Sequence, residues 1–367
     1  MKRILKSFFY AGLLASLIIG AGMFSLPFVF AQTGFLLGIS LLLFFVIVSI
    51  AIHIKYAKVV EKGGDEKMFG TFVEKYIGSD WKFPAMAVVL TGMIFSLLIY
   101  LVLSTSFIRL IAPGISSGMA AFLFWVIGSL FIFMGITKYA IVDFLAFLGI
   151  AGTILIIFIS GIRYGGNMRL NDASLSLMGL ASGPLLFSLY GRSAISSLWD
   201  KFNDTEKSKR LFLKSMVLGT AIPAICYVLF VYGVLRLSGS GVSVDSVSGI
   251  TLLPFGANLV IGILGVLTLI TSYIFLGLEI RGILKNDFKI GFGMATAATV
   301  IMPMAIYLFG FTDFIKLVSL GGGIFISIES ILVVLIYRKA IKKNNLTDIF
   351  LILLFAAIMI LEVMNFF

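Results

Sequence analysis

The sequence predicts an all-α integral membrane protein with eleven transmembrane helices, and three observations support this prediction. Of the 367 residues, 60% are hydrophobic and only 12% are charged, whereas soluble domains carry about 25% charged residues. The mean hydropathy is +1.14. Long apolar runs follow one another along the chain, and basic residues gather in alternate connecting segments. Because so few charges cannot cover a water-soluble surface, we expect the chain to lie in a lipid bilayer.

Eleven apolar runs are long enough to cross a bilayer, which takes about 20 helical residues. They cover residues 7–31, 34–56, 84–110, 117–136, 139–162, 178–199, 212–236, 255–281, 290–309, 316–337 and 348–366. Lys2, Arg3 and Lys6 precede the first run as basic residues precede the apolar region of a signal peptide. That region is shorter, at about 7–15 residues, so we expect a retained helix.

The basic residues indicate how the helices are oriented. With the N-terminus inside, six inside segments hold 22 of the 28 Lys and Arg residues: 1–6, 55–83, 137–139, 200–214, 281–289 and 338–347. Cytoplasmic loops carry such an excess, which predicts a multi-pass protein of the plasma membrane with its N-terminus inside and its C-terminus outside. The net charge of +11 therefore reflects orientation, and we expect no nucleic-acid partner and no obligatory protein partner.

The chain has a single cysteine, Cys226, and a single histidine, His53. No intrachain disulfide can form, and a zinc site or a Cys–His nucleophile pair would need more of these residues. We therefore expect no cofactor and no enzyme. His53 precedes Lys55 at a predicted helix end, where we expect it to lie at the membrane interface.

Two spans carry glycine and proline near their middle. The first reads LIIGAGMFSLP over 17–27, and the sixth reads GPLLFSLYGRS over 183–193. Glycine leaves the helical region cheaply and proline removes a hydrogen-bond donor. Irregular backbone inside a membrane survives only where it lines a cavity. The alternative is that Gly12, Ser16 and Gly20 form a helix-packing face.

The position of these two spans favours the cavity. Each opens a set of five helices, 7–162 and 178–338, and the odd number five inverts the second set. Residues 348–366 form an additional span. Interrupted helices at matching positions of two inverted halves indicate the binding site of a secondary transporter.

Three short segments resemble amino acid permeases. IIGAGMFSLPFVFAQTG over 18–34 is similar to the first-helix signature of the amino acid/auxin and aromatic amino acid permease branch of the amino acid–polyamine–organocation superfamily. TSYIFLG over 271–277 and FSLYG over 187–191 resemble its eighth helix and its unwound sixth helix. The resemblance implies the five-plus-five inverted-repeat fold of the leucine transporter, with the eleventh helix added.

An amino acid brings two charges that a low-dielectric site must satisfy. Backbone N–H groups at the start of a half-helix attract a carboxylate, and freed carbonyls can accept from the ammonium. In the families that the sequence resembles, the two breaks hold the substrate backbone. This assigns substrate binding to Gly20, Ala21, Gly22, Met23, Phe187, Ser188, Tyr190 and Gly191.

The resemblance also implies an ion site. In sodium-coupled members, carbonyls of the first helix and a Thr/Ser pair of the eighth bind Na⁺. The matching groups here are the carbonyls of Ser16, Ile19 and Thr268 and the hydroxyls of Thr271 and Ser272. Some proton-coupled relatives carry a lysine in the fifth helix, but residues 140–161 contain no Lys or Arg, which favours Na⁺. The alternative is that these hydroxyls bond their own backbone.

Charges inside a membrane are costly and mark function by default. Arg192 follows the break in span six, Glu279 lies in span eight and Glu329 in span ten. We expect Arg192 to pair with Glu279 or Glu329 as a cytoplasmic gate. Two alternatives stay open: one glutamate carries a proton, or the pair is only structural.

Three further segments have recognisable patterns. Residues 65–78 predict an interfacial helix, because their apolar residues share one face. The Gly/Ser-rich segment 237–253 predicts a flexible connection or a lid. Gly321, Gly322 and Gly323 predict a hinge or a close approach in span ten.

The sequence therefore predicts a secondary active amino acid transporter that works by cation symport and alternating access. Sodium is favoured over H⁺, and a neutral or aromatic substrate is favoured, although Arg192 could instead attract an acidic one. A non-transporting sensor or scaffold of the same fold is the alternative. An ion channel would need rings of like charge or carbonyls in a symmetric oligomer.

Overall fold

The fold is all-helical throughout the residues that a computed structural model of the chain describes, namely 2–64, 68–135, 140–168, 178–199, 206–238, 241–250, 253, 255–343 and 345–366. The first half contains α1 (Lys2–Ile18), a 3₁₀ turn (Ala21–Ser25), α2 (Leu26–Thr33), α3 (Phe35–Gly63), α4 (Phe69–Tyr76), a 3₁₀ turn (Ser79–Trp81), α5 (Lys82–Ile111), α6 (Ser117–Met134) and α7 (Ala140–Tyr164). The second half contains α8 (Met178–Ser188), α9 (Arg192–Trp199), α10 (Glu206–Leu237), α11 (Phe255–Asn286), α12 (Phe292–Leu308), α13 (Phe314–Leu320), a π-helical turn (Gly321–Ile326), α14 (Ser327–Ile341) and α15 (Leu346–Phe366).

Each of the eleven predicted spans contains helix. Within the described residues, seven helices are long and apolar enough to cross a membrane, and the bent pair Tyr10–Ile18 and Ala21–Thr33 makes an eighth. The helical class and the many apolar spans are therefore confirmed. Eleven crossings, the inverted halves 7–162 and 178–338 and the orientation of the termini stay predictions.

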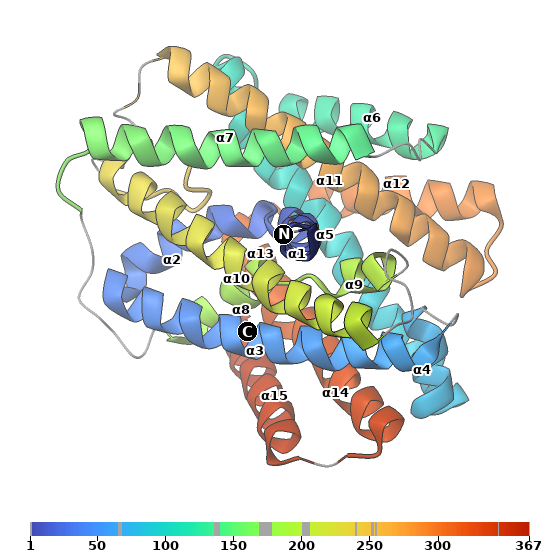
Figure 1. The fold of residues 1–367 in the computed structure, drawn as a ribbon. Coiled ribbons are helices and arrows are strands. Elements are labelled where there is room, and N and C mark those ends of the chain that lie inside the picture. Colours follow the sequence, from blue (N-terminus) through green and yellow to red (C-terminus); the bar gives the residue numbers. More distant parts are fainter. Residues whose placement is uncertain are drawn as a thin grey trace.

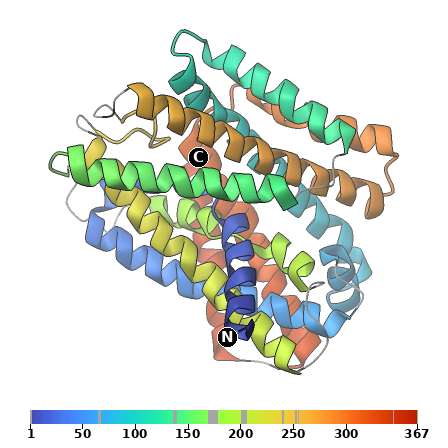
Figure 2. The same ribbon diagram turned by 45° about the horizontal axis from the view of Figure 1, so that its top comes forward.

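The broken helices lie in the middle of the molecule. Figure 1 shows α1 nearly end-on at the centre, and α6 and α12 lie together at one edge in both views (Figures 1 and 2). Helix α10 packs on α1, α3 and α7, while α11 packs on α5, α6 and α7. Because α1 and α8 are enclosed by the longer helices, their breaks are shielded from the outer surface of the bundle.

Both breaks occur where the sequence predicts them. The first span bends by 52° between Tyr10–Ile18 and Ala21–Thr33, and Gly20 is extended there with φ −140°. The second break covers residues 189–191. Pro184 stays inside α8. The helix therefore ends at the segment that contains Gly191, and not at the proline.

The three glycines of span ten allow close packing. A Cβ on Gly322 would lie 1.8 Å from the carbonyl oxygen of Gly183, so no other residue fits at position 322 in this arrangement. The close approach that these glycines predict is confirmed, and it brings the π-helical turn against α8 next to the second break.

Two contacts place three helix ends on one side of the molecule. Lys55 of α3 forms an ion pair with the buried Asp348 of α15, and Lys62 donates to the carbonyl of Ala340 in α14. The segments 55–83 and 338–347, both predicted to be cytoplasmic, therefore lie on the same side.

The prediction that His53 lies at the membrane interface is wrong. His53 is 3% exposed, and its Nδ1 lies 2.8 Å from the hydroxyl oxygen of Thr220 in α10. Helix α3 continues to Gly63, well beyond the predicted end at residue 56, so His53 is internal.

The helix predicted within residues 65–78 is present as α4, although residues 65–67 lie outside the described part of the chain, and its position at the membrane interface stays a prediction. Phe69, Phe72 and Val73 are buried, and the rings of Phe69 and Phe72 pack near Tyr56. These ring contacts hold α4 against α3.

Candidate functional site

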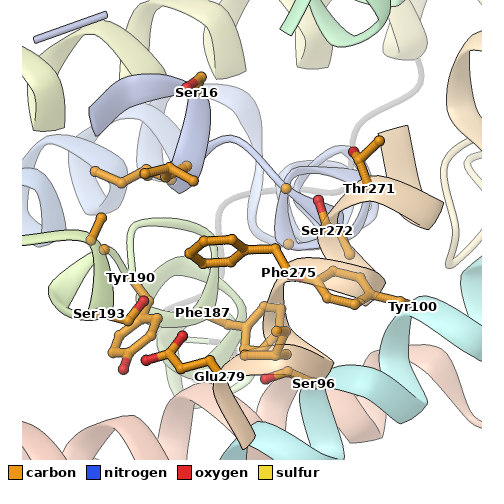
Figure 3. Close-up of a pocket in the computed structure, with 18 residues that line it drawn as sticks. Ser16, Ser96, Tyr100, Phe187, Tyr190, Ser193, Thr271, Ser272, Phe275 and Glu279 are labelled. Atoms are coloured by element: carbon orange, nitrogen blue, oxygen red, sulfur yellow. The ribbon is translucent and has the colours of Figure 1, made fainter. Parts of the chain in front are cut away.

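A cavity of about 110 Å³ lies between the two breaks and α11 (Figure 3). Four elements supply its walls: the first break, α5, the second break and α11. The residues that line it include Ser16, Gly20, Ala21, Gly22, Ser96, Tyr100, Phe187, Tyr190, Gly191, Ser193, Thr271, Ser272, Phe275, Leu276 and Glu279. A water molecule needs about 10–15 Å³ by this kind of measure, so the space suits a molecule of amino-acid size.

The two breaks touch each other directly. A Cβ on Gly22 would lie 2.7 Å from the Cα of Ser188 and 2.9 Å from its backbone nitrogen. Backbone atoms cannot move aside as a flexible side chain can, so position 22 requires glycine. This contact brings the irregular backbone of both halves to one wall of the cavity.

Most of the residues predicted to bind substrate are brought together here. Those that line the cavity are Gly20, Ala21, Gly22, Phe187, Tyr190 and Gly191. Met23 and Ser188 do not line it and are 0% and 1% exposed. The hydroxyl of Ser188 donates to the carbonyl of Leu185 at 2.9 Å, so only its backbone faces the break.

Tyr227 of α10 is a site residue that the sequence analysis missed. It is fully buried, and its hydroxyl lies 2.5 Å from the carbonyl oxygen of Ser188 and 3.3 Å from that of Ile18. A tyrosine in an apolar run of residues gives no sequence signal for such a contact. The phenol satisfies backbone acceptors that the two breaks release.

Three of the five predicted ion-binding residues line the cavity. Ser16, Thr271 and Ser272 line it, while Thr268 and Ile19 are buried, at 2% and 3% exposure. The hydroxyl of Thr271 donates to the carbonyl of Thr268 at 2.8 Å, and that of Ser16 donates to the carbonyl of Leu13 at 2.8 Å. The lone pairs of both hydroxyl oxygens stay available to a small cation.

Arg192 pairs with Glu329, one of its two predicted partners. The Tyr190 hydroxyl donates to the two carboxylate oxygens of Glu329 at 2.9 and 3.1 Å, and Arg192 donates to the Tyr190 oxygen at 3.2 Å. The guanidinium also lies 4.5 Å from the centre of the Phe69 ring. These contacts tie the second break to α14 and α4.

Glu279, the other predicted partner, interacts with the charge of Arg192 but forms no ion pair with it among the described residues. Its carboxylate oxygen Oε2 is buried and makes no hydrogen bond with any residue that the structure describes. Figure 3 shows the Glu279 carboxylate at the end of the cavity where Ser96 and Tyr190 also lie. The Glu279 side chain therefore lines the space that a ligand would occupy, and one of its two carboxylate oxygens has no donor among the described residues.

A second cavity, of about 380 Å³, continues from this end. It shares Ser193, Phe275 and Glu279 with the first cavity and extends to Phe69 of α4 and Asp287. Because α4 belongs to the segment 55–83, the site opens toward the predicted cytoplasmic side.

The opposite side of the site is closed by aromatic packing and by the loop after α10. The Phe24 ring packs edge-on against Phe107 and Phe230, with ring centres 5.0 and 5.2 Å apart. Ser246 of the loop donates to the carbonyl of Phe24 at 2.5 Å. The described part of the segment 237–253 thus covers the first break, as expected of a lid.

Asp245 organises this lid. It accepts hydrogen bonds from Ser106 of α5, from Ser243 at 2.6 Å and from the Ser248 hydroxyl at 2.8 Å. Burial alone would raise the pKa of the Asp245 carboxyl, but these hydrogen bonds hold the pKa below its ordinary value. The charged carboxylate is therefore the form that the folded lid stabilises.

A central cavity between two broken helices is typical of the binding site of a membrane transporter, and the family and relatives of the chain are transporters and not enzymes. The chain belongs to the tryptophan/tyrosine permease family, whose model matches residues 5–366. The resemblance to aromatic amino acid permeases is thereby confirmed.

Three similar proteins agree with this class. The tyrosine-specific transport system 1 of Haemophilus influenzae is 24% identical over 355 residues, which cover 90% of this chain and 88% of that protein. A manganese transporter of Eremococcus coleocola is 12% identical with a TM-score of 0.67, over 97% of this chain and 85% of its own. A nucleobase-cation-symport-1 family transporter is 12% identical with a TM-score of 0.65, over 94% of this chain and 80% of its own. The two solved structures support the leucine-transporter type of fold.

Proposed function

We propose that the chain is a secondary active transporter that carries an aromatic amino acid into the cell by cation symport and alternating access. The observation that carries the proposal is the contact of Gly22 with Ser188 beside the cavity, because it brings the backbone of both helix breaks, with N–H and C=O groups, to one ligand-sized space. The aromatic substrate rests on the family and on the tyrosine-specific relative.

The two ends of an amino acid backbone fit the two breaks. The turn Ala21–Ser25 begins at the first break, and the N–H groups at the start of a helix favour a carboxylate. Carbonyls of residues 187–190 can accept from the ammonium. The rings of Tyr100, Phe187 and Phe275 line the same cavity and offer an aromatic side chain apolar surface and edge-to-face contacts.

The closed side and the open side of the site support alternating access. Phe24, Phe107 and Phe230 close one side, and the larger cavity leads away on the other. Transport would require the first set of contacts to open while the larger cavity, which Arg192 and Phe69 line, closes. The gate role of Arg192 and Glu329 is part of this proposal.

Sodium is the coupling ion that we favour. The carbonyls of Ser16, Ile19 and Thr268 and the hydroxyls of Thr271 and Ser272 would supply five oxygens, which are suitable ligands for a hard cation at a broken helix. Proton coupling is the second candidate, and the unpartnered carboxylate oxygen of Glu279 is the observation that favours it.

Uptake of labelled tyrosine and tryptophan into proteoliposomes tests the function. We expect accumulation when a sodium gradient is imposed, and Thr271→Ala should raise the sodium concentration needed for half-maximal uptake about tenfold or more. Thr91→Ala is the matched control, because the exposed Thr91 also donates to its own helix backbone, at 2.8 Å, but lies outside the cavity.

Two results would contradict parts of this proposal. If accumulation depends on a proton gradient and not on sodium, the coupling ion is H⁺ and not Na⁺. The absence of accumulation of any amino acid under either gradient, with binding retained, would instead indicate a non-transporting sensor.

A further inference from the structure

We propose that Glu279 selects aromatic substrates that carry a hydrogen-bond donor at the tip of the side chain, which admits tyrosine and tryptophan and rejects phenylalanine. This inference rests on the proposed function and assigns the residue that reads the substrate side chain. It rests on the order of polar and aromatic groups along the cavity, on the unpaired carboxylate oxygen of Glu279 and on the different hydrogen-bond donors of the three aromatic amino acids.

The cavity has a polar end, an aromatic middle and a second polar end. Along α11, Thr271 and Ser272 are followed one turn later by Phe275 and two turns later by Glu279, all lining the cavity. Eight residues of helix cover about 12 Å, enough for an aromatic amino acid. Figure 3 shows Phe275 and Phe187 between the Thr271 end and the Glu279 end.

At the second polar end, three of the hydrogen-bonding groups near Glu279 are engaged with other partners. Ser96 donates to the carbonyl of Gly92 at 3.0 Å, and Tyr190 donates to Glu329. Arg192 is engaged by Glu329 and Tyr190. Glu279 Oε2 remains buried and without a hydrogen bond among the described residues, although buried polar atoms are normally paired.

A ligand that brings a donor to this end completes the site. The phenol O–H of tyrosine and the indole N–H of tryptophan are donors, whereas the ring of phenylalanine has none. With phenylalanine bound, the buried Oε2 of Glu279 would still lack a donor. Sites built to bond a substrate O–H or N–H reject the analogue that lacks it by factors as large as about 10⁴–10⁵.

Replacing the acceptor tests this role. Competition against labelled tyrosine uptake in proteoliposomes should show that the unmodified protein prefers tyrosine to phenylalanine by about 100-fold or more. Glu279→Leu should reduce that preference to below about tenfold while phenylalanine uptake persists. Glu279→Gln keeps a carbonyl acceptor and should retain most of the preference. O-methyltyrosine and 1-methyltryptophan, whose donors are blocked, should compete as weakly as phenylalanine.

The control and the second measurement separate selection from folding and coupling. Asp287→Asn removes a carboxylate that lines only the larger cavity, and it should leave the preference unchanged. Where Glu279→Leu abolishes all uptake, the shift in melting temperature of the purified protein with tyrosine and with phenylalanine gives the same ratio.

Two results would overturn the inference: an unchanged preference in Glu279→Leu, or equal competition by tyrosine and O-methyltyrosine in the unmodified protein. Loss of proton-driven accumulation in Glu279→Gln, together with an unchanged preference in Glu279→Leu, would make Glu279 a proton carrier instead. If the unmodified protein binds and transports no aromatic amino acid, the proposed function itself fails, which is a distinct outcome.

Discussion

The hydroxyl of Tyr227 donates a 2.5 Å hydrogen bond to the carbonyl oxygen of Ser188. The Tyr227 hydroxyl oxygen also lies 3.3 Å from the carbonyl oxygen of Ile18, the last residue of α1. Because helix breaks release carbonyls that water cannot reach, each needs a donor from elsewhere in the fold. One buried phenol of α10 therefore joins the two broken helices at the candidate site.

Tyr227→Phe should destabilise the protein and impair transport. The change removes only the hydroxyl, and a buried acceptor left without its donor costs about 1–3 kcal/mol. We expect a lower melting temperature of the purified protein and a lower initial rate of tyrosine uptake. Tyr232→Phe is the matched control on the same helix, since the Tyr232 ring packs on Phe158. Equal effects of the two variants would show that the bridge has no special role.

Gly22→Ala should abolish uptake, because its Cβ would lie 2.7 Å from the Cα of Ser188. The two breaks would have to separate, and the wall of the cavity would be lost. Gly12→Ala is the matched control in the same span, where a Cβ would meet nothing within 4 Å. Uptake by the Gly12 variant should equal that of the unmodified protein. Normal uptake by Gly22→Ala would contradict the observed contact between the breaks.

The sequence predicts the breaks but not what holds them. Glycine at positions 20 and 22 changes the backbone preference locally, so the break is visible in the residues themselves. Tyr227 contacts a residue 39 positions away, and Lys55 pairs with Asp348 across 293 positions. Neither contact leaves a local pattern, because each depends on how distant helices pack.

The same distinction separates Arg192 from His53. An arginine inside an apolar span needs a partner, so a pairing with Glu279 or Glu329 could be predicted and the structure selects Glu329. His53 stands beside Lys55 and therefore resembles a helix end, but Asp348 neutralises Lys55 inside the fold. Removal of that charge from the surface is a tertiary effect that the sequence does not reveal.

Glu329→Gln should strongly destabilise the site around Arg192. The side chains of Arg192 and Glu329 are 7% and 8% exposed, and breaking a buried pair from one side costs about 3–5 kcal/mol. We expect a large loss of uptake and of thermal stability. The double variant Arg192→Gln with Glu329→Gln should recover stability, because no isolated charge remains buried.

An exposed ion pair serves as the control for the Arg192 and Glu329 variants. Lys82 and Glu74 lie 2.6 Å apart with side chains 32% and 48% exposed, where pairs contribute about 0–1 kcal/mol. Glu74→Gln should therefore change the melting temperature little. If Glu329→Gln lowers the melting temperature as little as Glu74→Gln does, the ion pair of Arg192 with Glu329 does not stabilise the protein more than an exposed pair.

Asp245 should make the stability of the lid sensitive to acid. The pKa of its carboxyl lies below the ordinary value of 3.8, because hydrogen bonds from Ser106, Ser243 and Ser248 outweigh the effect of burial. As the pH falls below about 3.8, the unfolded chain binds the proton first. The stability that the carboxylate contributes is therefore complete above about pH 5, and it declines as the pH falls toward the lower pKa of the folded state.

Melting temperatures from about pH 3 to 7 should show this decline in the unmodified protein but less of it in Asp245→Asn, whose amide does not titrate. The exposed Asp80 serves as the control, and Asp80→Asn should keep the full decline. If the Asp245 and Asp80 variants lose stability in acid to the same extent, the hydrogen bonds to Asp245 do not stabilise its charge.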